Sequence, residues 1–150
     1  MSKPTDVSFA TTQHIRDRCL CLHLQRAARM IARSFDDALR PLDLTNGQFS
    51  LLNALNRPQP AGIGSVAALL AMDRTTLTAA LKPLERRGLI NVAIDPADRR
   101  SRMLTLTREG RSLLARAVPI WKRTHVHVEH GLAGADPGLL RRDLKTLSSC

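Results

Sequence analysis

The stretch Ala67–Gly110, AALLAMDRTTLTAALKPLERRGLINVAIDPADRRSRMLTLTREG, decides the fold that this sequence predicts. It begins inside a short helix for which Ser65 is the expected cap, and a tight turn leads to a second helix over Asp73–Arg87. Gly88 follows that helix and suits the left-handed backbone that commonly ends one. The segment DPADRR then supplies a turn between two short apolar runs. The stretch therefore predicts two helices followed by a β-hairpin.

The second helix has one apolar face and one polar face. At about 100° per residue, Leu81 and Leu84 fall within about 40° of Leu77 and form the side that is expected to be buried. The opposite face carries hydroxyl, methyl and basic groups, and hydroxyl groups in the first turn of such a helix can contact base edges in a major groove. Its basic side chains suit phosphates, which supply affinity but no sequence information. A solvent-exposed amphipathic helix is the alternative interpretation.

The hairpin after this helix is strongly basic. Its strands are expected at residues 89–94 and 101–106, and Arg99, Arg100 and Arg102 lie close together between them or at their edge. A helix sized for a major groove beside a positive finger sized for a minor groove is the layout of a winged helix-turn-helix, so we expect the chain to bind double-stranded DNA. The residues expected to contact DNA are Ser65, Arg74, Thr75, Thr76, Thr78, Ala79, Lys82, Arg86, Arg99, Arg100 and Arg102.

Composition supports a polyanionic partner and excludes other classes of protein. The 150 residues are 43% hydrophobic, enough for a packed core, and carry a formal net charge of +10. That charge alone would also suit RNA or an anionic membrane surface. No apolar run approaches the ~20 residues of a membrane helix, so no membrane association is expected. Without a glycine-rich phosphate loop, a nucleophile motif or paired carboxylates in a suitable context, neither an enzyme nor a cofactor is expected.

The flanking segments are predicted to be helical. One long helix is expected from about His14 to Arg40, and another starts at Thr45, which has capping-box spacing to Gln48. Thr107 and Asp136 are expected to start the last two helices. The predicted fold class is mainly α with a small β-wing, and terminal helices longer than one small lobe can cover indicate a two-fold dimer. The expected organisation is a frayed N-terminus (1–12), a helical dimerisation region (13–44 and 108–150) and a winged helix-turn-helix lobe (45–107).

Three motifs closely resemble those of the MarR family of bacterial regulators. They are D-R-T-T-L-T-x-x-L-K-P-L-E-R-R-G-L-I at Asp73–Ile90, D-P-x-D-R-R at Asp95–Arg100 and L-T-x-x-G at Leu106–Gly110. The upstream segment Asp36–Leu55, DDALRPLDLTNGQFSLLNAL, is also similar. The resemblance covers roughly residues 14–130.

This resemblance implies a homodimer in the bacterial cytoplasm, on the nucleoid, with two winged lobes on successive major grooves of a near-palindromic operator. Members are mostly repressors that a small anionic or phenolic compound, or an oxidant, releases from DNA. By resemblance, Asp98 braces the wing and Arg100 reaches into the minor groove. Arg99 and Arg102 would then contact phosphates.

The second helix, Asp73–Arg87, is the expected recognition helix. It departs from the family pattern at Ala79 and Ala80, where members with this motif often carry a larger polar or basic residue. At Ala79, direct reading of a base is reduced to a methyl contact. Specificity would then depend on Thr75, Thr76, the wing or DNA shape. A winged-helix scaffold with little sequence specificity is therefore one alternative function.

An effector site is expected between the first helix, the helix from Thr45 and the helix from Thr107. The candidate lining residues are His14, Arg18, Leu22 and Trp121.

Cysteines provide a second alternative, an oxidant-sensing repressor that uses Cys19 or Cys21. Some relatives sense hydroperoxides through a cysteine of the first helix, held by tyrosines of the partner chain, but this sequence has no tyrosine. A reactive thiolate would need cationic neighbours, which Arg16, Arg18 or His23 could provide. Small buried cysteines are the other interpretation, and Cys150 is expected to be incidental.

Three histidines raise the question of a metal site. The spacings of His125, His127 and His130 do not place all three on one helical face, and only Glu129 accompanies them. No metal site is expected.

Overall fold

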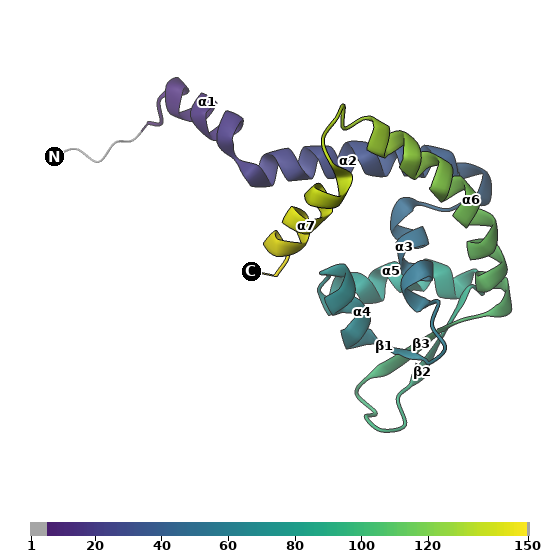
Figure 1. Ribbon diagram of the computed structural model, residues 1–150. Coiled ribbons are helices and arrows are strands. Elements are labelled where there is room, and N and C mark those ends of the chain that lie inside the picture. Colours follow the sequence, from purple (N-terminus) through teal and green to yellow (C-terminus); the bar gives the residue numbers. More distant parts are fainter. Residues whose placement is uncertain (1–5, 150) are drawn as a thin grey trace.

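The structure, a computed structural model, describes residues 6–149 and is mainly helical with one small antiparallel sheet (Figure 1). This fold class confirms the prediction. The elements are α1 (Phe9–Arg18), α2 (Leu20–Leu39), the 3-10 helix η1 (Arg40–Leu42), α3 (Asn46–Leu55), β1 (Ala61–Gly62), α4 (Ile63–Leu70), α5 (Arg74–Arg86), β2 (Ile90–Ile94), β3 (Arg102–Leu106), α6 (Arg108–His130) and α7 (Pro137–Leu147).

The sheet has the strand order β1-β3-β2, and both pairings are antiparallel. β2 and β3 form the expected hairpin within one residue of the predicted bounds, and its tip extends away from the helices at the bottom of Figure 1. Ala61 lies opposite Leu104 and Ile90 lies opposite Leu106, so both outer strands pair with β3. This hairpin is called the wing below.

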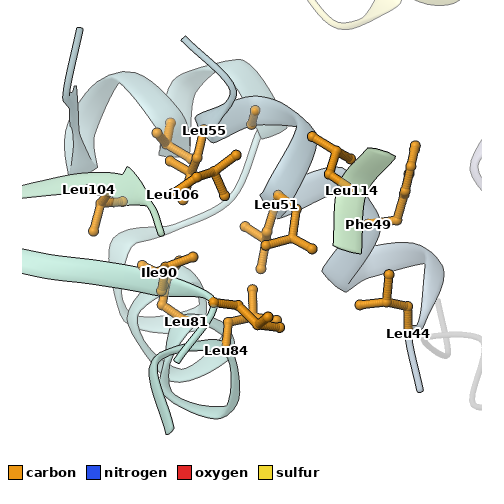
Figure 2. Close-up of a cluster of buried hydrophobic side chains, with 14 of the residues drawn as sticks. Leu44, Phe49, Leu51, Leu55, Leu81, Leu84, Ile90, Leu104, Leu106 and Leu114 are labelled. Atoms are coloured by element: carbon orange, nitrogen blue, oxygen red, sulfur yellow. The ribbon is translucent and has the colours of Figure 1, made fainter. Parts of the chain in front are cut away.

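The core of the lobe is built almost entirely from leucine. Leu77, Leu81 and Leu84 of α5 are buried, as the periodicity predicts. Figure 2 shows Leu81 and Leu84 beside Ile90 of the sheet and Leu51 of α3. Leu52 of α3 and Leu104 of β3 are fully buried as well. Since burying one leucine contributes about 2 kcal/mol, this cluster holds α5 firmly against the lobe and leaves its other face exposed.

Local sequence signals set most of the helix starts. The capping box of α3 is present, because the Gln48 N–H donates to Thr45 Oγ1 and the Thr45 N–H donates to Gln48 Oε1, each at 3.1 Å. Thr107 and Asp136 cap α6 and α7 as expected. Gly88, with φ of 70°, ends α5 in the left-handed region.

The junction between α5, the wing and α6 is tied together by Thr107. Its hydroxyl donates to the Gly88 carbonyl at 2.6 Å, and its N–H donates to the Leu89 carbonyl at 3.1 Å. The same hydroxyl accepts the Gly110 N–H at 3.0 Å. The residues that follow α5 are therefore bonded directly to Thr107, which caps the long helix α6.

α2 and α6 lie side by side and join the lobe to the terminal helices (Figure 1). Trp121 of α6 stacks near Phe35 of α2 and Phe49 of α3, with ring centroids 6.4 and 6.2 Å apart. Such aromatic contacts stabilise the helix junction beyond the area that they bury.

The prediction of a single helix from His14 to Arg40 is wrong, because the helix is interrupted at Cys19. This residue has an extended backbone, with φ of −68° and ψ of 107°. Its N–H donates to the Ile15 carbonyl at 2.9 Å and ends α1, while its Sγ accepts the Leu22 N–H at 3.4 Å and starts α2. The sequence did not reveal this interruption, because cysteine is not among the residues that usually cap a helix.

Two further expectations at helix starts need correction. α4 begins after Gly62, and Ser65 lies inside its first turn, where its hydroxyl donates back to the Gly62 carbonyl at 2.9 Å. Ser65 is therefore not the cap. Of the segment expected to be frayed (1–12), residues 1–5 lie outside the described residues, while the chain is already helical from Phe9.

The terminal helices α1 and α7 bury none of their described residues within one chain. α1 projects away from the rest of the molecule (Figure 1). Among residues 6–149, no helix is both long and apolar enough to cross a membrane.

Candidate DNA-binding surface

The turn between α4 and α5 fixes the angle at which the recognition helix α5 is presented. Ala71 ends α4 with φ of 51°, and Asp73 then caps α5. The Thr76 N–H donates to Asp73 Oδ1 at 2.8 Å, and the Thr76 hydroxyl donates to Asp73 Oδ2 at 2.7 Å. These hydrogen bonds, first that of the Thr76 backbone, lower the pKa of Asp73, so the cap stays charged at neutral pH.

The exposed face of α5 forms a shallow hollow of about 340 Å³ that is lined by five predicted DNA contacts. They are Arg74, Thr75, Thr78, Ala79 and Lys82. All five are exposed, while the leucines of the same helix are buried. A row of hydroxyl, methyl and basic groups along one helix face can meet base edges and phosphates of one groove.

The three threonines of this helix differ in what they can offer to DNA. The Thr76 hydroxyl is engaged by the Asp73 cap, and the Thr78 hydroxyl donates to the Arg74 carbonyl at 2.7 Å. Thr75 makes no side-chain hydrogen bond to any other residue within 6–149. Thr75 is therefore the threonine whose donor and acceptor are both available for a base.

Lys82 lines the hollow, and Arg86 is exposed one helical turn later. Replacing Lys82 with alanine is expected to weaken binding to all duplex sequences and to make the slope of log K against log salt shallower by about one unit. Fluorescence anisotropy at several salt concentrations measures both quantities. A loss confined to one base position would contradict the phosphate role.

The tip of the wing is held by hydrogen bonds from backbone N–H groups to the side chains of Asp95 and Asp98. Asp98 Oδ1 accepts the Arg100 N–H at 3.0 Å, and the Asp98 carbonyl accepts the Ser101 N–H at 2.9 Å. Asp95 Oδ1 likewise accepts the Ala97 N–H at 2.9 Å. Asp98 thus folds the tip through the backbone, which fits its predicted bracing position.

The wing arginines also differ from one another. The Arg102 guanidinium donates to the Arg99 and Ser101 carbonyls at 3.3 and 3.2 Å, so it is turned back onto the wing. Arg99 and Arg100 are exposed, and their guanidinium groups have no acceptor among the described residues. They are the wing cations that are free to enter a groove.

Of the four residues expected to line an effector site, the structure places Trp121 at a cavity between helices. Trp121 lines a cavity of about 500 Å³ between α3, α4 and α6, while His14, Arg18 and Leu22 do not line it. His14 and Arg18 lie on α1, which projects away from the rest of the molecule (Figure 1), whereas Leu22 lies on α2.

Sequence reasoning missed Ser50, Asn53 and Lys122, which are the polar residues of the Trp121 cavity. Phe49 and Asn53 are four residues apart on α3, as are Val118 and Lys122 on α6. Helical spacing could therefore have placed each pair on one face, but only packing shows that the two faces meet.

The cysteines and histidines take separate positions. Cys19 is half-buried at the helix break and Cys21 is exposed, whereas Cys150 lies outside the described residues. His125 stacks on Trp121 with ring centroids 4.6 Å apart, and its Nε2 lies 3.0 Å from Glu129 Oε1. Glu129 also accepts a hydrogen bond from Arg141 of α7, the main cause of its lowered pKa. Among residues 6–149, no three His, Cys, Asp or Glu side chains could together hold a metal ion.

Comparison with known proteins identifies the family. The MarR family pattern matches residues 44–101. BadR, a transcriptional activatory protein of Rhodopseudomonas palustris, is 36% identical over 95 residues, covering 61% of this chain and 54% of BadR. The chain thus spans about half the length of the curated relatives that it matches.

Solved structures match over nearly the whole chain. The M. tuberculosis transcriptional regulator MosR in complex with DNA is 36% identical, with a TM-score of 0.78 over 88% of this chain and 95% of MosR. BpsR of Bordetella bronchiseptica, whose DNA binding is regulated by 6-hydroxynicotinic acid, is 26% identical, with a TM-score of 0.76 over 97% of this chain and 99% of BpsR. With this fold, these motifs and these relatives, the chain belongs to the MarR family of DNA-binding transcriptional regulators.

Proposed function

We propose that this chain acts in the cytoplasm as a homodimeric repressor that binds a near-palindromic operator and is released by a small aromatic anion. The observation that supports DNA binding most directly is the hollow along α5, lined by Arg74, Thr75, Thr78, Ala79 and Lys82, beside the free arginines of the wing. One such lobe reads one half-site, so a two-fold dimer reads a palindrome.

Exposed apolar side chains on the terminal helices support the dimer. Ile15 of α1 and Leu20 of α2 are 56% and 66% exposed, and Leu139 and Leu147 of α7 are 50% and 49% exposed. A helix of a soluble protein rarely leaves so much apolar surface uncovered, and a second copy would cover it. Residues 13–44 and 108–150 are therefore proposed as the dimerisation region, with 45–107 as the DNA-binding lobe.

Genomic footprinting of the wild-type protein tests this function. Enriched sites with two-fold symmetric half-sites, and increased transcription of the adjoining genes in a deletion strain, are the expected results. Binding without enriched sites would instead favour a scaffold with little sequence specificity, which the small side chains of Ala79 and Ala80 would suit.

The Trp121 cavity is the proposed effector site. It lies between α3 and α4 of the lobe and α6, so a ligand there would contact both the proposed DNA-binding lobe and the proposed dimerisation region. Phe49, Leu70 and Trp121 supply an apolar and aromatic lining, while Lys122 supplies a cation and Ser50 a hydroxyl. This combination suits an aromatic ring that bears a carboxylate.

Binding of an aromatic carboxylate should change the fluorescence of Trp121, the single tryptophan of the chain. With 6-hydroxynicotinate or benzoate as the probe, Lys122→Ala is expected to raise the dissociation constant about threefold to tenfold, because an exposed charge-assisted hydrogen bond is lost. Lys145→Ala on α7 is the matched control. Equal affinity of wild type and Lys122→Ala would contradict this site.

An oxidant switch is the second candidate, and the capping role of Cys19 is the observation that favours it. Its Sγ holds the Leu22 N–H at the start of α2, and Cys21 lies two residues later. An organic hydroperoxide would oxidise one thiolate to a sulfenic acid with release of an alcohol, and the second thiol would then displace water to form a disulfide. The Sγ would leave its capping position, so the start of α2 would loosen.

Treatment with organic hydroperoxide separates this candidate from ligand release. Oxidation is expected to release wild-type protein from DNA and to leave the Cys19→Ser, Cys21→Ser variant bound. Mass spectrometry should find a loss of two hydrogens in the peptide that contains both cysteines. Equal release of both proteins would exclude the switch.

A further inference from the structure

We propose that Gly64 in α4 positions the Arg74 guanidinium for contact with a DNA phosphate, so that this glycine sets part of the DNA affinity without touching DNA itself. The inference rests on the proposed DNA-binding function and assigns a positioning role to a residue outside the recognition helix.

Arg74 lies across the backbone of the preceding helix. A Cβ atom at Gly64 would lie 2.8 Å from one terminal nitrogen of the Arg74 guanidinium, 3.6 Å from its Cζ and 3.9 Å from its Nε. The guanidinium therefore occupies the space that any larger residue at position 64 would fill. Glycine lowers helix stability relative to alanine, so its presence in the first turn of α4 calls for such a packing reason.

The position of Arg74 on α5 explains why its guanidinium lies beside Gly64. Arg74 is the first residue of the helix, and helical side chains point back toward the N-terminus. Its guanidinium thus lies beside α4, at the N-terminal end of the hollow that Arg74 lines together with Thr78, Ala79 and Lys82. A group on this flank meets the sugar-phosphate backbone beside the groove rather than the base edges within it.

Arg74 is available for that contact. It is exposed, and its guanidinium has no acceptor among residues 6–149. Five N–H donors in a planar fork match the oxygens of a phosphate, and packing against Gly64 reduces the conformational freedom that is lost on binding. The open backbone at Gly64 thus preorganises the cation.

Alanine at position 64 should displace the guanidinium and leave the fold intact. The clash is with the far end of a flexible side chain and not with backbone, so Arg74 can rotate away. Gly47 provides a matched control, since it is also the second residue of its helix and its added Cβ would meet nothing closer than Thr45 Oγ1 at 3.9 Å.

The test is a double-mutant cycle of Gly64→Ala and Arg74→Ala with mixed-sequence duplex DNA as the probe, at several salt concentrations. Arg74→Ala should weaken binding about tenfold and reduce the salt slope by about 0.9. Gly64→Ala should weaken binding about threefold to tenfold, yet change affinity by less than about twofold when Arg74 is already alanine. Gly47→Ala should stay within about twofold of wild type. The melting temperature of Gly64→Ala should be no lower than that of wild type, as expected for a helix that gains alanine.

Three results of the binding measurements would overturn the inference. They are wild-type affinity in Gly64→Ala, an equal loss in both Arg74 backgrounds, and a loss confined to one duplex sequence, which would assign Arg74 to a base. In the DNA-free protein, the Arg74 Nε–H resonance should shift in Gly64→Ala and not in Gly47→Ala, and the absence of a shift would also overturn it. Wild-type protein that binds no duplex would refute the proposed function and this inference together, whereas wild-type binding with a failed cycle would refute the inference alone.

Discussion

Replacing Arg100 with alanine should weaken operator binding about 10- to 100-fold while the protein stays folded. A well-placed arginine contact to bases contributes about 1–3 kcal/mol, and the narrow minor groove has an enhanced negative potential that attracts guanidinium groups. Arg100 is exposed at the wing tip, and its side chain has no acceptor among the described residues, so no internal contact is lost on its removal. Anisotropy titrations and circular dichroism measure the two expectations.

Arg102 is the control for this experiment. Its guanidinium is engaged by the Arg99 and Ser101 carbonyls of the wing, so Arg102→Ala should have the smaller effect on affinity. Binding of Arg100→Ala within about twofold of wild type would remove the wing tip from the mechanism, since one such contact normally exceeds that effect.

Replacing Gly110 with alanine should produce the largest loss of stability. A Cβ at this position would lie 2.0 Å from the Leu89 carbonyl oxygen and 3.0 Å from the Leu89 carbonyl carbon, both backbone atoms. The same oxygen accepts the Thr107 N–H, so moving it would break the tie between the wing and α6. We expect the free energy of unfolding to fall by about 3 kcal/mol or more, as measured by urea denaturation.

Gly47→Ala serves again as the control, because the nearest atom to an added Cβ there is Thr45 Oγ1, at an ordinary contact distance of 3.9 Å. It should leave the free energy of unfolding unchanged or raise it by up to about 1 kcal/mol. If Gly110→Ala lowers the free energy of unfolding by less than about 1 kcal/mol, α6 can shift away from Leu89, and the close contact between Gly110 and the Leu89 carbonyl does not limit stability.

Local rules predicted the lobe because its signals lie close together in sequence. The apolar period of Leu77, Leu81 and Leu84, the cap at Asp73 and the left-handed Gly88 each act within a few residues. The motif L-T-x-x-G marks the family by resemblance, and the structure supplies its physical reason. Thr107 caps α6 and bonds the wing, while Gly110 admits the Leu89 carbonyl.

Sequence reasoning failed where the outcome depends on packing between distant segments. The apolar spacing of the long predicted helix begins only at Leu20, so nothing in it showed that the sulfur atom of Cys19 would cap a new helix there. His14 and Arg18 were expected to continue the helix that carries Leu22, whereas the structure places them on the separate helix α1. Long-range contacts decide which faces meet, and a helical pattern does not contain them.

The bonds from Thr107 to Gly88 and Leu89 have a mechanical consequence for control of transcription. They connect the end of α5 and the start of the wing to α6, so a tilt of α6 would move the proposed DNA contacts on α5 and the wing together. A ligand bound at Trp121 would thus act by changing the distance between the two DNA-binding lobes of the proposed dimer, and neither lobe would have to unfold.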